Sequence, residues 1–472
     1  MAKNFVCLLE ATAARFPHKT ALIWDGGSLS YAEFHARTAG FACWLAKKGI
    51  QSGDRIALLM SNRWTFIAAL LGGWKLGATI APLSALLKQE ERAAIMADLN
   101  PKLVLEDVEA EPGSWDTVVE VSSPTLVSYT SGSLGQPKGA LISHSALAFA
   151  SRSWAHMLAL TPEDVVLAVL PLSHSYGMGG ALLAPLFTGS AIALVERFSP
   201  EAVFDTIRER RVTVFPGVAT MFRRLLSAPE IARADFSSLR VAASGAAPCP
   251  FEIVEEWRQR TGTRILRGYG MTELYRPISY VAEDPKEWAD AIGRAAPGVE
   301  IKVVDDAGQP LPTGEMGELW IKSPAALDGY LNDPELTQET LVDGWFKTGD
   351  LATISANGLV RIVGRKRERI LRGGYSVFPQ EIEAVLLSHP AVAEAAVVGL
   401  PHPVLEEEVA AFVSLKQGTT ASAEELSAYC QGRLAAYKYP RQIHILTALP
   451  RGVTGKVQKA ELLKWKLGAL ST

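Results

Sequence analysis

The chain has 472 residues, which is too long for a single hydrophobic core, so two or more domains are expected. Hydrophobic residues make up 48% of the chain and charged residues 21%, a balance typical of an ordinary soluble globular protein. The 47 basic and 50 acidic residues leave a net charge of −3, which gives no electrostatic footprint for nucleic acid or an anionic membrane.

Cysteine usage and the N-terminus bear on the cellular compartment. The cysteines lie far apart and form no C-x-x-C pair, which fits a reducing cytoplasm better than a zinc site or disulfide framework; they are Cys7, Cys43, Cys249 and Cys430. The first residues reach Glu10 without a long apolar run, so no secretory signal is expected. The uncharged stretch from Tyr176 to Val195 is long enough for a membrane helix, but its glycines and Pro185 predict a buried helix, a turn and a strand.

Helical and strand patterns alternate from the start of the chain to about residue 285. Near the N-terminus, helical patterns cover Tyr31 to Lys48 and Trp64 to Leu76, with a strand predicted at Arg55 to Met60 between them. Further strands are predicted at residues 165–170, 191–195, 212–215 and 241–244. This alternation predicts an α/β fold in which helices cover mostly parallel sheets.

The pattern changes after about residue 291. Short β runs at 299–304, 317–321 and 359–363 are separated by turn residues, which predicts a small β-barrel-like subdomain. A charged run follows at 365–369, and such a run is usually a solvated linker or helix end. Residues 380–472 then predict a compact α+β domain, with helices at 380–388 and 423–433 and strands at 391–398, 408–415 and 442–445. We therefore expect two domains, 1–366 and 367–472.

The segment Leu126 to Gly139, with the sequence LVSYTSGSLGQPKG, carries the first chemical signal. A short apolar strand leads into a loop of glycines, hydroxyl side chains and a lysine, and a second strand follows. Such a loop can surround phosphates with backbone N–H groups, hydroxyl donors and a positive charge. It differs from a Walker A loop, in which a helix begins at the lysine. Taken alone, a Gly/Ser-rich surface turn is the alternative. The candidate phosphate contacts are Thr130, Ser131, Gly132, Ser133, Gly135 and Lys138.

This segment resembles the phosphate-loop signature of the adenylate-forming superfamily, which includes acyl-CoA synthetases, adenylation domains of peptide synthetases and luciferases. The usual form is YTSGTTGxPKG, and this chain has Ser133-Leu134 where the family has two threonines, so one hydroxyl is lost. The segment between residues 105 and 126 is also shorter than in most relatives. The resemblance implies a large nucleotide-binding domain followed by a small mobile domain.

A second signature of the family lies at residues 268–273. In the resemblance, Tyr269 offers a flat face to adenine, Thr272 donates to the α-phosphate, and Glu273 is a hard oxygen ligand for Mg²⁺. The motif consists of Gly268, Tyr269, Gly270, Met271, Thr272 and Glu273. A strand-end turn that resembles the segment beside the adenine consists of Gly245, Ala246, Ala247 and Pro248. Taken alone, that turn is equally an ordinary strand-to-helix turn.

Ribose and hinge positions follow from the same resemblance. Asp350, in the sequence GWFKTGD, corresponds to the acid that accepts hydrogen bonds from both ribose hydroxyls, and Arg365 to a second ribose or phosphate contact. Two residues further on, the family has a hinge that is commonly Asp or Lys, whereas this chain has Arg367. Gly373 and Gly374 resemble the loop that leaves room for the pantetheine arm of coenzyme A.

Two further residues complete the predicted catalytic set. Lys456, in the sequence PRGVTGK, resembles the lysine that bridges the carboxylate and the α-phosphate in the first half-reaction. His174, in the sequence PLSHSYG, resembles a residue that lies over the nascent acyl-adenylate, and a buried core histidine is the alternative.

The resemblance implies an ATP-dependent carboxylic acid–CoA ligase that uses ATP, Mg²⁺ and coenzyme A, located in the cytoplasm. A stand-alone adenylation enzyme that loads a carrier protein, a luciferase-type oxidase and a non-catalytic nucleotide-binding protein are the alternatives. The chain lacks, near His174, the Asp with which amino-acid-activating relatives hold an α-ammonium group.

Arg276, just beyond the Thr-Glu pair, is predicted to face the acyl pocket and pair with a small polar acid; the alternative is an arginine turned to solvent or paired with a local acid. Short hydroxy or dicarboxylic, aromatic and medium-chain acids all stay candidate substrates, and the oligomeric state is open.

Overall fold

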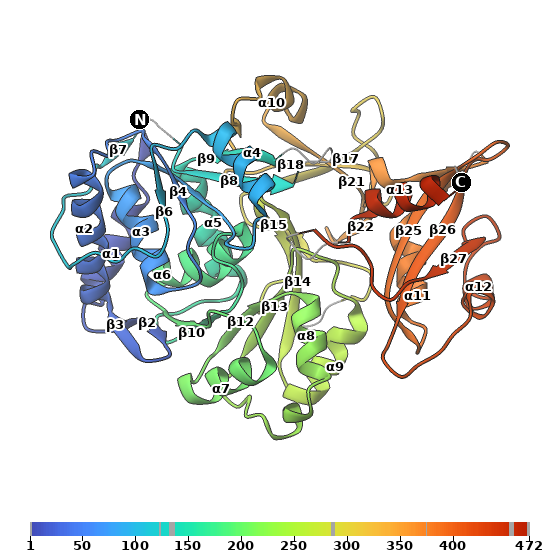
Figure 1. The fold of residues 1–472 in the computed structure, drawn as a ribbon, viewed down its shortest axis with the longest axis horizontal. Helices are drawn as coiled ribbons and strands as arrows, with labels where there is room; N and C mark the ends of the chain where they lie inside the picture. The colour runs from blue at the N-terminus through green and yellow to red at the C-terminus, as the bar shows by residue number, and fades with distance from the viewer. Residues whose placement is uncertain are drawn as a thin grey trace. The chain divides into compact units, whose positions relative to one another are not determined.

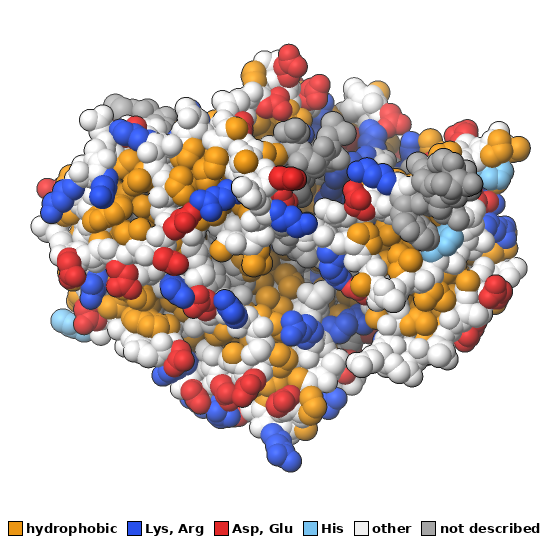
Figure 2. All heavy atoms as spheres, viewed as in Figure 1, with side chains coloured by type: hydrophobic (Ala, Val, Ile, Leu, Met, Phe, Trp, Pro, Cys, Tyr) orange, Lys and Arg blue, Asp and Glu red, His pale blue; other side chains and the backbone are white. Residues whose placement is uncertain are grey.

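The computed structural model describes residues 2–121, 124–131, 137–284, 288–373, 375–452 and 457–469. The chain divides into two compact units, and each is described by itself below (Figure 1). The N-terminal unit comprises Met1–Ile301, Ile321–Lys347 and Asn357–Val360, and the C-terminal unit comprises Lys302–Trp320, Thr348–Ala356 and Arg361–Thr472. Figure 2 shows basic and acidic side chains interspersed over the viewed face, as the small net charge leads one to expect.

Mostly parallel sheets form the core of the N-terminal unit, as predicted. Within the described residues, a nine-stranded sheet has the order β16 (Arg294–Ala295), β15 (Tyr275–Ser279), β14 (Arg264–Met271), β13 (Val241–Ser244), β12 (Val214–Gly217), β10 (Val165–Ala168), β11 (Ala191–Leu194), β2 (Thr20–Trp24) and β3 (Gly27–Ser30). A six-stranded sheet has the order β19 (Gly329–Tyr330), β9 (Pro137–Ile142), β8 (Leu126–Ser131), β5 (Thr79–Pro82), β4 (Arg55–Leu58) and β6 (Leu103–Leu105). A short pair joins β1 (Ala2–Lys3) to β7 (Glu120–Val121).

Helices follow the strands along the chain and cover these sheets (Figure 1). They are α1 (Val6–Arg15), α2 (Tyr31–Lys47), α3 (Trp64–Lys75), α4 (Gln89–Leu99), α5 (His144–Met157), η1 (Gly177–Leu183), α6 (Ala184–Thr188), α7 (Pro200–Arg210), α8 (Ala219–Leu226), η2 (Pro229–Arg233), α9 (Phe251–Thr261) and α10 (Pro334–Thr340). Local capping fixes where several of them begin. At α2, for example, Ser30 and Glu33 cap each other's backbone N–H groups, so the helix starts at the next residue, Tyr31.

The nine-stranded sheet is buried on both faces because its side chains alternate between two apolar clusters. Ile265 packs in the cluster that contains Trp257 of α9, and its neighbour Leu266 packs in the opposite cluster with Trp154 of α5. The second face is the one covered by α5, and residues of the candidate site lie on this side of the sheet.

The uncharged stretch from Tyr176 to Val195 folds as predicted, into buried helical turns (η1 and α6) followed by strand β11. Among the residues that the structure describes, no helix combines the length and the apolar character needed to cross a membrane.

An ion pair between the buried Asp164 and the exposed Arg240 contributes to the stability of the N-terminal unit. Asp164 accepts two hydrogen bonds from Arg240, each of 2.8 Å, and further ones from Thr213 Oγ1 at 2.6 Å and the N–H of Thr161 at 2.8 Å. Burial alone would raise the pKa of the Asp164 carboxyl, but these hydrogen bonds outweigh burial and hold the pKa below its usual value.

We expect Asp164→Asn to lower the free energy of unfolding by about 2 kcal/mol at pH 7, because charge-assisted hydrogen bonds are lost in a buried place. Because the pKa of the Asp164 carboxyl is lower in the folded protein than in the unfolded chain, its ionised form stabilises the fold above about pH 4. This stabilisation is lost as the pH falls through the folded-state pKa. Urea unfolding at pH 7 and at a pH well below 4 should therefore show the difference from the unaltered chain shrinking at the lower pH. Glu163→Gln, at the exposed neighbouring position, is the control.

The C-terminal unit contains the predicted α+β domain. In the described residues a sheet has the order β24 (Tyr375–Val377), β23 (Ile370–Arg372), β26 (Glu406–Leu415) and β25 (Val392–His402), and β27 (Gln442–Ile445) pairs with β26. Helices α11 (Pro379–Leu387), α12 (Ala423–Gln431) and α13 (Lys459–Ala469) and the short turn η3 (Lys366–Glu368) complete it. The predicted strand at 442–445 is reproduced residue for residue, and the other elements differ from prediction by a few residues at their ends.

The predicted β-rich segment forms a further sheet, whose residues are divided between the two units. Its order is β17 (Glu300–Val304), β18 (Gly317–Lys322), β21 (Trp345–Ile354) and β20 (Leu341–Val342), with β22 (Val360–Arg365) paired to β21. The expected fold class, α/β sheets with a β-rich part and a C-terminal α+β domain, is confirmed. The domain boundary between residues 366 and 367 stays a prediction.

Candidate active site

The predicted strand–loop–strand arrangement of the phosphate loop is present. Strands β8 and β9 pair antiparallel, with Thr130 opposite Lys138 and Ser131 opposite Pro137. The hydroxyl of Thr130 and the ammonium of Lys138 therefore start from facing positions at the end of the hairpin. Predicted contacts Gly132, Ser133 and Gly135 lie outside the described residues.

The turn 245–248 and the motif 268–273 lie side by side because their strands are parallel neighbours. Strand β13 pairs in parallel with β14, with Ser244 opposite Arg267, so residues after Ser244 emerge next to Gly268. Carboxyl ends of parallel strands meet at one edge of a sheet, where α/β proteins commonly bind ligands. The structure thus brings together the residues predicted to contact adenine.

Close backbone approach explains the second glycine of the 268–273 motif. Strand β14 turns back antiparallel into β15, with a register shift between Tyr269 and Met271. A Cβ atom at Gly270 would lie only 1.9 Å from the carbonyl oxygen of Tyr275, so a side chain cannot fit there. The turn places Thr272 and Glu273 at the tip of the hairpin.

Thr272 meets the segment that carries His174. The Thr272 hydroxyl is buried and lies 3.4 Å from the hydroxyl of Ser175. The neighbouring His174 is partly exposed, which contradicts the alternative of a buried core histidine, and its Nδ1 accepts a hydrogen bond of 3.1 Å from the N–H of Tyr176. This bond fixes the orientation of the ring. Three predicted parts of the site, at 174, 245–248 and 268–273, therefore belong to one place in the N-terminal unit.

Glu273 has the chemistry of a magnesium ligand. Its half-buried carboxylate accepts a hydrogen bond of 3.1 Å from the hydroxyl of Tyr330, which orients it. Burial, and then the nearby Glu273, raise the pKa of Tyr330, so this phenol stays a donor. Mg²⁺ is typically held by one or two carboxylates together with substrate phosphates and water, and the oriented carboxylate of Glu273 fits this pattern. Within the described residues there is no cluster of three metal-binding side chains, as a dedicated protein cage would require.

The two residues predicted to bind ribose are paired within the C-terminal unit. Asp350 in β21 is buried, and its Oδ1 lies 3.4 Å from Nε of Arg365 at the end of β22. The N–H of Asp350 donates to the hydroxyl of Thr348, which fixes the backbone at this point. The acid and the base predicted to bind ribose therefore lie next to each other, as an ion pair.

The predicted coenzyme A loop begins in a conformation that suits glycine. Gly373 has a φ of +55°, and its N–H donates to the carbonyl oxygen of Leu405. The preceding Arg372 forms a two-pronged ion pair with Glu408, at 2.6 and 3.0 Å. Gly374 and the predicted catalytic Lys456 lie outside the described residues.

Arg276 is buried, with only 5% of its surface exposed, so the alternative of an arginine turned to solvent is wrong. Its guanidinium donates to the carbonyl oxygens of Ser244 at 3.2 Å and Leu266 at 2.9 Å, and its Nε donates to Ser279 Oγ at 3.0 Å. A Cβ atom at Gly268 would lie 2.5 Å from this guanidinium. The first glycine of the 268–273 motif therefore leaves the space that the Arg276 head group fills.

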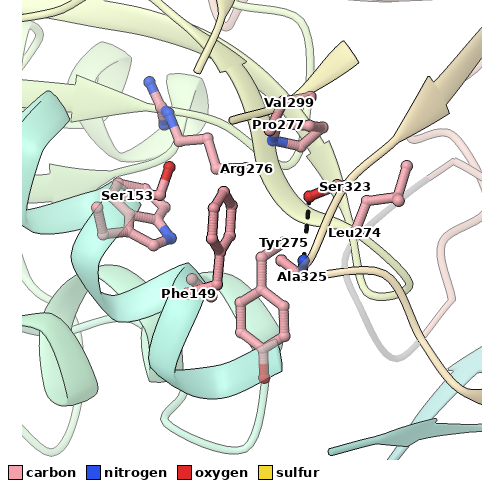
Figure 3. Close-up of a pocket in the computed structure, with 11 residues that line it drawn as sticks. Phe149, Ser153, Leu274, Tyr275, Arg276, Pro277, Val299, Ser323 and Ala325 are labelled. Atoms are coloured by element: carbon pink, nitrogen blue, oxygen red, sulfur yellow. Dashed lines mark hydrogen bonds between the residues drawn. The ribbon is translucent and has the colours of Figure 1, made fainter. Parts of the chain in front are cut away.

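Aromatic side chains stack beneath the guanidinium. The Arg276 head group lies 4.7 Å from the ring centre of Trp154, and Trp154 stacks on Tyr176 with ring centres 5.4 Å apart. Next to them is a cavity of about 10 Å³, which holds roughly one water molecule (Figure 3). It is lined by α5 and by the residues directly after Glu273, Arg276 among them.

Two side chains of the cavity wall, Ser153 and Trp154, have unmet hydrogen-bonding capacity, and so does the hydroxyl of Tyr275, which Figure 3 shows directed away from Arg276. In the part of the chain that the structure describes, the buried Ser153 Oγ, Trp154 Nε1 and Tyr275 Oη have no hydrogen-bond partner. Tyr275 also has a φ of +57°, a backbone conformation that costs a bulky residue energy and that tends to occur at functional sites. Figure 3 shows the Ser153 hydroxyl directed toward Arg276, and the ring of Phe149, also from α5, beside the residues 275–277.

Sequence reasoning missed Tyr330, Ser175 and Trp154. Tyr330 is 57 residues from the Glu273 it contacts, and Trp154 lies on a helix whose pattern indicates only burial. Ser175 lies inside the predicted segment 171–177, and its position next to His174 was the one available signal.

Comparison with known proteins gives this arrangement a family. The family described as AMP-binding enzyme matches residues 9–122 and 115–331, and the AMP-binding enzyme C-terminal domain matches residues 381–456. A feruloyl-CoA synthase of an Amycolatopsis species is 33% identical, covering 94% of this chain and 96% of its own length. An indoleacetate–CoA ligase of Aromatoleum aromaticum is 32% identical, covering 96% of each chain. The o-succinylbenzoate coenzyme A synthetase of Bacillus subtilis, solved with ATP and magnesium, has a TM-score of 0.88 and 30% identity, covering 98% of this chain and 99% of its own.

The chain belongs to the AMP-binding enzyme family. It is an enzyme of the acid–thiol ligase class that forms AMP, as the resemblance of its motifs predicted.

Proposed function

We propose that this chain joins a small, polar carboxylic acid to coenzyme A at the expense of ATP. In the first half-reaction an oxygen of the acid bonds to the α-phosphorus of ATP and pyrophosphate leaves, which gives an acyl-adenylate. In the second, the sulfur of coenzyme A bonds to the acyl carbon, AMP leaves and the thiol proton is released. The observation that carries the proposal is the convergence of Thr272, Glu273 and the His174 segment at one edge of the parallel sheet.

Each residue has a role in this proposal. Thr130 and Lys138 hold the β- and γ-phosphates, with Ser131 and the loop glycines, and Thr272 donates to the α-phosphate. Mg²⁺, held by Glu273, would neutralise charge on the phosphates. Asp350 and Arg365 bind the ribose, and Lys456 serves the α-phosphate. These assignments rest on the family signatures and on the pairings described above.

The acid is small and polar because of the wall formed by Trp154, Tyr275 and Arg276. Large side chains fill the space beyond Thr272 and Glu273, and the remaining cavity holds about one water molecule. Burying unpaired hydroxyl and indole N–H groups is costly, so a ligand that brings its own acceptors is favoured there. A short hydroxy, oxo or dicarboxylic acid fits both conditions better than an unbranched fatty acid does.

The predicted domain arrangement is part of the proposal. The boundary lies between residues 366 and 367, and Arg367 is the hinge about which residues 367–472 turn between the half-reactions. A cytoplasmic location follows from the spacing of the four cysteines and the supply of ATP and coenzyme A.

A panel of acids tests the reaction and the substrate class together. Acetate, lactate, malonate, benzoate, ferulate and octanoate are compared by pyrophosphate release, with and without coenzyme A. We expect lactate or malonate to exceed octanoate by at least about tenfold in kcat/KM, since each mismatched methylene or polar contact is worth roughly that factor. Pyrophosphate release that needs a carrier protein and not coenzyme A would favour the carrier-loading alternative. Absence of release with every acid would contradict the proposed substrate class.

Arg276→Met tests the polar wall separately, because methionine keeps most of the volume and removes every donor. We expect the preference for the best polar acid over octanoate to fall by about 10- to 100-fold, as unpaired polar groups remain in the wall. Arg294→Met is the matched control, because Arg294 is partly exposed and bound to Asp284. An unchanged ratio of the two acids in Arg276→Met would show that Arg276 does not select the substrate.

A further inference from the structure

Within the C-terminal unit, a half-buried lysine lies between two glutamates close to the predicted hinge. Lys459 Nζ lies 3.0 Å from Glu368 Oε2 and 2.8 Å from Glu383 Oε1, and the Lys459 side chain is 24% exposed. Glu383 is itself held, because its Oε1 accepts a hydrogen bond of 2.8 Å from the N–H of Val397 in β25. Three separate segments, η3, α11 and the start of α13, therefore meet at one ammonium group.

The pKa shifts of Lys459 and Glu368 both favour the charged form of each group. Burial would lower the pKa of Lys459, but Glu383 and Glu368 outweigh burial and raise the pKa. Burial would likewise raise the pKa of Glu368, but Lys459 outweighs it and lowers the pKa. An ion pair in a half-buried place with several hydrogen bonds restrains its partners more firmly than an exposed pair does.

Lys459 also stands at the base of the loop that carries Lys456. That base is closed by a β-bridge between Arg451 and Val457 and by a hydrogen bond of 2.8 Å from the N–H of Gln458 to the carbonyl oxygen of Pro450. Helix α13 begins at Lys459, and the buried Leu462 fixes the helix in the apolar cluster of β25 and β26. The ends of the loop are thus attached to the body of the C-terminal domain.

The residue on the other side of the predicted hinge is anchored differently. Lys366 Nζ lies 2.9 Å from Oδ1 of Asp306, which follows β17, and 3.1 Å from Oε2 of Glu318 in β18. Arg367, between the two anchored residues, is exposed. The predicted hinge residue therefore lies between Lys366, which is paired with Asp306 and Glu318, and Glu368, which is paired with Lys459.

We propose that Lys459 is a positioning residue. Its ion pair with Glu368 holds the base of the Lys456 loop against the segment after the hinge, so that the two move together when residues 367–472 turn. This inference rests on the proposed function, in which Lys456 acts on the α-phosphate and Arg367 is the hinge. Without this ion pair, rotation at Arg367 would no longer deliver the loop to a fixed place. The first half-reaction depends on that delivery. The coenzyme A loop of the second is held by a separate pair, Arg372 and Glu408.

Lys459→Met tests the role of this ion pair when the two half-reactions are measured separately. Adenylation is followed as pyrophosphate release from ATP with the best acid of the panel, without coenzyme A. Thioester formation is followed with the purified adenylate of the same acid and coenzyme A. We expect kcat for adenylation to fall by about 10- to 100-fold, since a displacement of about 1 Å costs roughly that factor. The KM values for ATP and acid, and the thioester rate, should stay within about twofold of those of the unaltered chain.

Two variants separate positioning from a general structural role. Lys464→Met removes another lysine of α13, which is exposed and paired only with Glu461 at 3.0 Å among the contacts described, and should leave both rates unchanged. Lys459→Arg keeps the charge and should restore most of the adenylation rate. Equal loss of both half-reactions in Lys459→Met, or no loss in either, would overturn the inference.

Glu368→Gln provides an independent measurement if Lys459→Met folds poorly, because it keeps the shape and removes one charge. It should also slow adenylation selectively, and the double variant should be no slower than Lys459→Met alone, as expected for two residues that act through one contact. Additive losses in the double variant would contradict this role. If the unaltered chain releases no pyrophosphate with any acid, the proposed function fails and this inference with it; a failure confined to the variants leaves the proposed function standing.

Discussion

Lys456→Ala is expected to slow acyl-adenylate formation from free acid and ATP by about 10²- to 10³-fold, the usual cost of removing one positioned charge-stabilising group. Two anions, the carboxylate and the α-phosphate, must approach each other, and a cation lowers that repulsion most in the transition state. Thioester formation from a supplied acyl-adenylate should persist at near the unaltered rate, because its α-phosphate bond is already made. Stopped assays of pyrophosphate release and of thioester formation give the two rates.

The control for this experiment is Lys464→Ala, an exposed lysine eight positions further along the chain. It should leave both half-reactions unchanged. If Lys456→Ala slows both steps equally, the lysine does not act in the first half-reaction alone, and the proposed turn of residues 367–472 between the two half-reactions is wrong.

Glu273→Gln should have the second large effect, a fall in kcat of about 10²-fold that higher magnesium concentrations partly restore. The substitution keeps an oxygen that accepts the hydrogen bond from Tyr330, so the local shape is preserved while the charge is lost. Mg²⁺ binds hard anionic oxygens, and a neutral amide is a weaker ligand. Titration of pyrophosphate release with MgCl₂ at saturating ATP measures the effect.

Tyr330→Phe is the matched variant for this second prediction. It leaves the carboxylate of Glu273 charged and removes only its orienting donor, so we expect a smaller loss, of about 10-fold, as for other groups that orient a metal ligand. A Glu273→Gln enzyme with unchanged magnesium dependence would mean that the metal is bound elsewhere.

Much of the fold was predictable because the chain's periodicity is strong. The strands at 241–244 and 442–445 coincide with those of the structure, since the first is a short, mainly apolar run and the second alternates polar and apolar residues. The adjacency of residues 245–248 and 268–273 then follows from the parallel order of β13 and β14. The phosphate hairpin was predictable for the same local reason.

Contacts between distant segments could not be predicted in this way. Nothing in the sequence near Glu273 indicates that Tyr330 will reach it, because a hydrogen bond across 57 residues depends on the packing of β19 against β9. The environment of Arg276 depends on two glycines, Gly245 and Gly268, whose missing side chains leave room for a guanidinium. A sequence pattern records the glycines but not what fills the space beside them. The roles of Lys456 and of the 132–136 loop stay predictions.

The position of the Arg276 head group has a consequence for how acid preference can change in this chain. The guanidinium that lines the small cavity, and that we propose borders the acyl pocket, also donates to the carbonyl oxygens of Ser244 in β13 and Leu266 in β14. Selection for a new acid cannot remove this side chain without also loosening the strands that lead to the nucleotide motifs. Substitutions that change acid preference should therefore occur first at Trp154 or Tyr275, which border the same cavity. A substitution of Arg276 should follow only after another donor has formed hydrogen bonds to the carbonyl oxygens of Ser244 and Leu266.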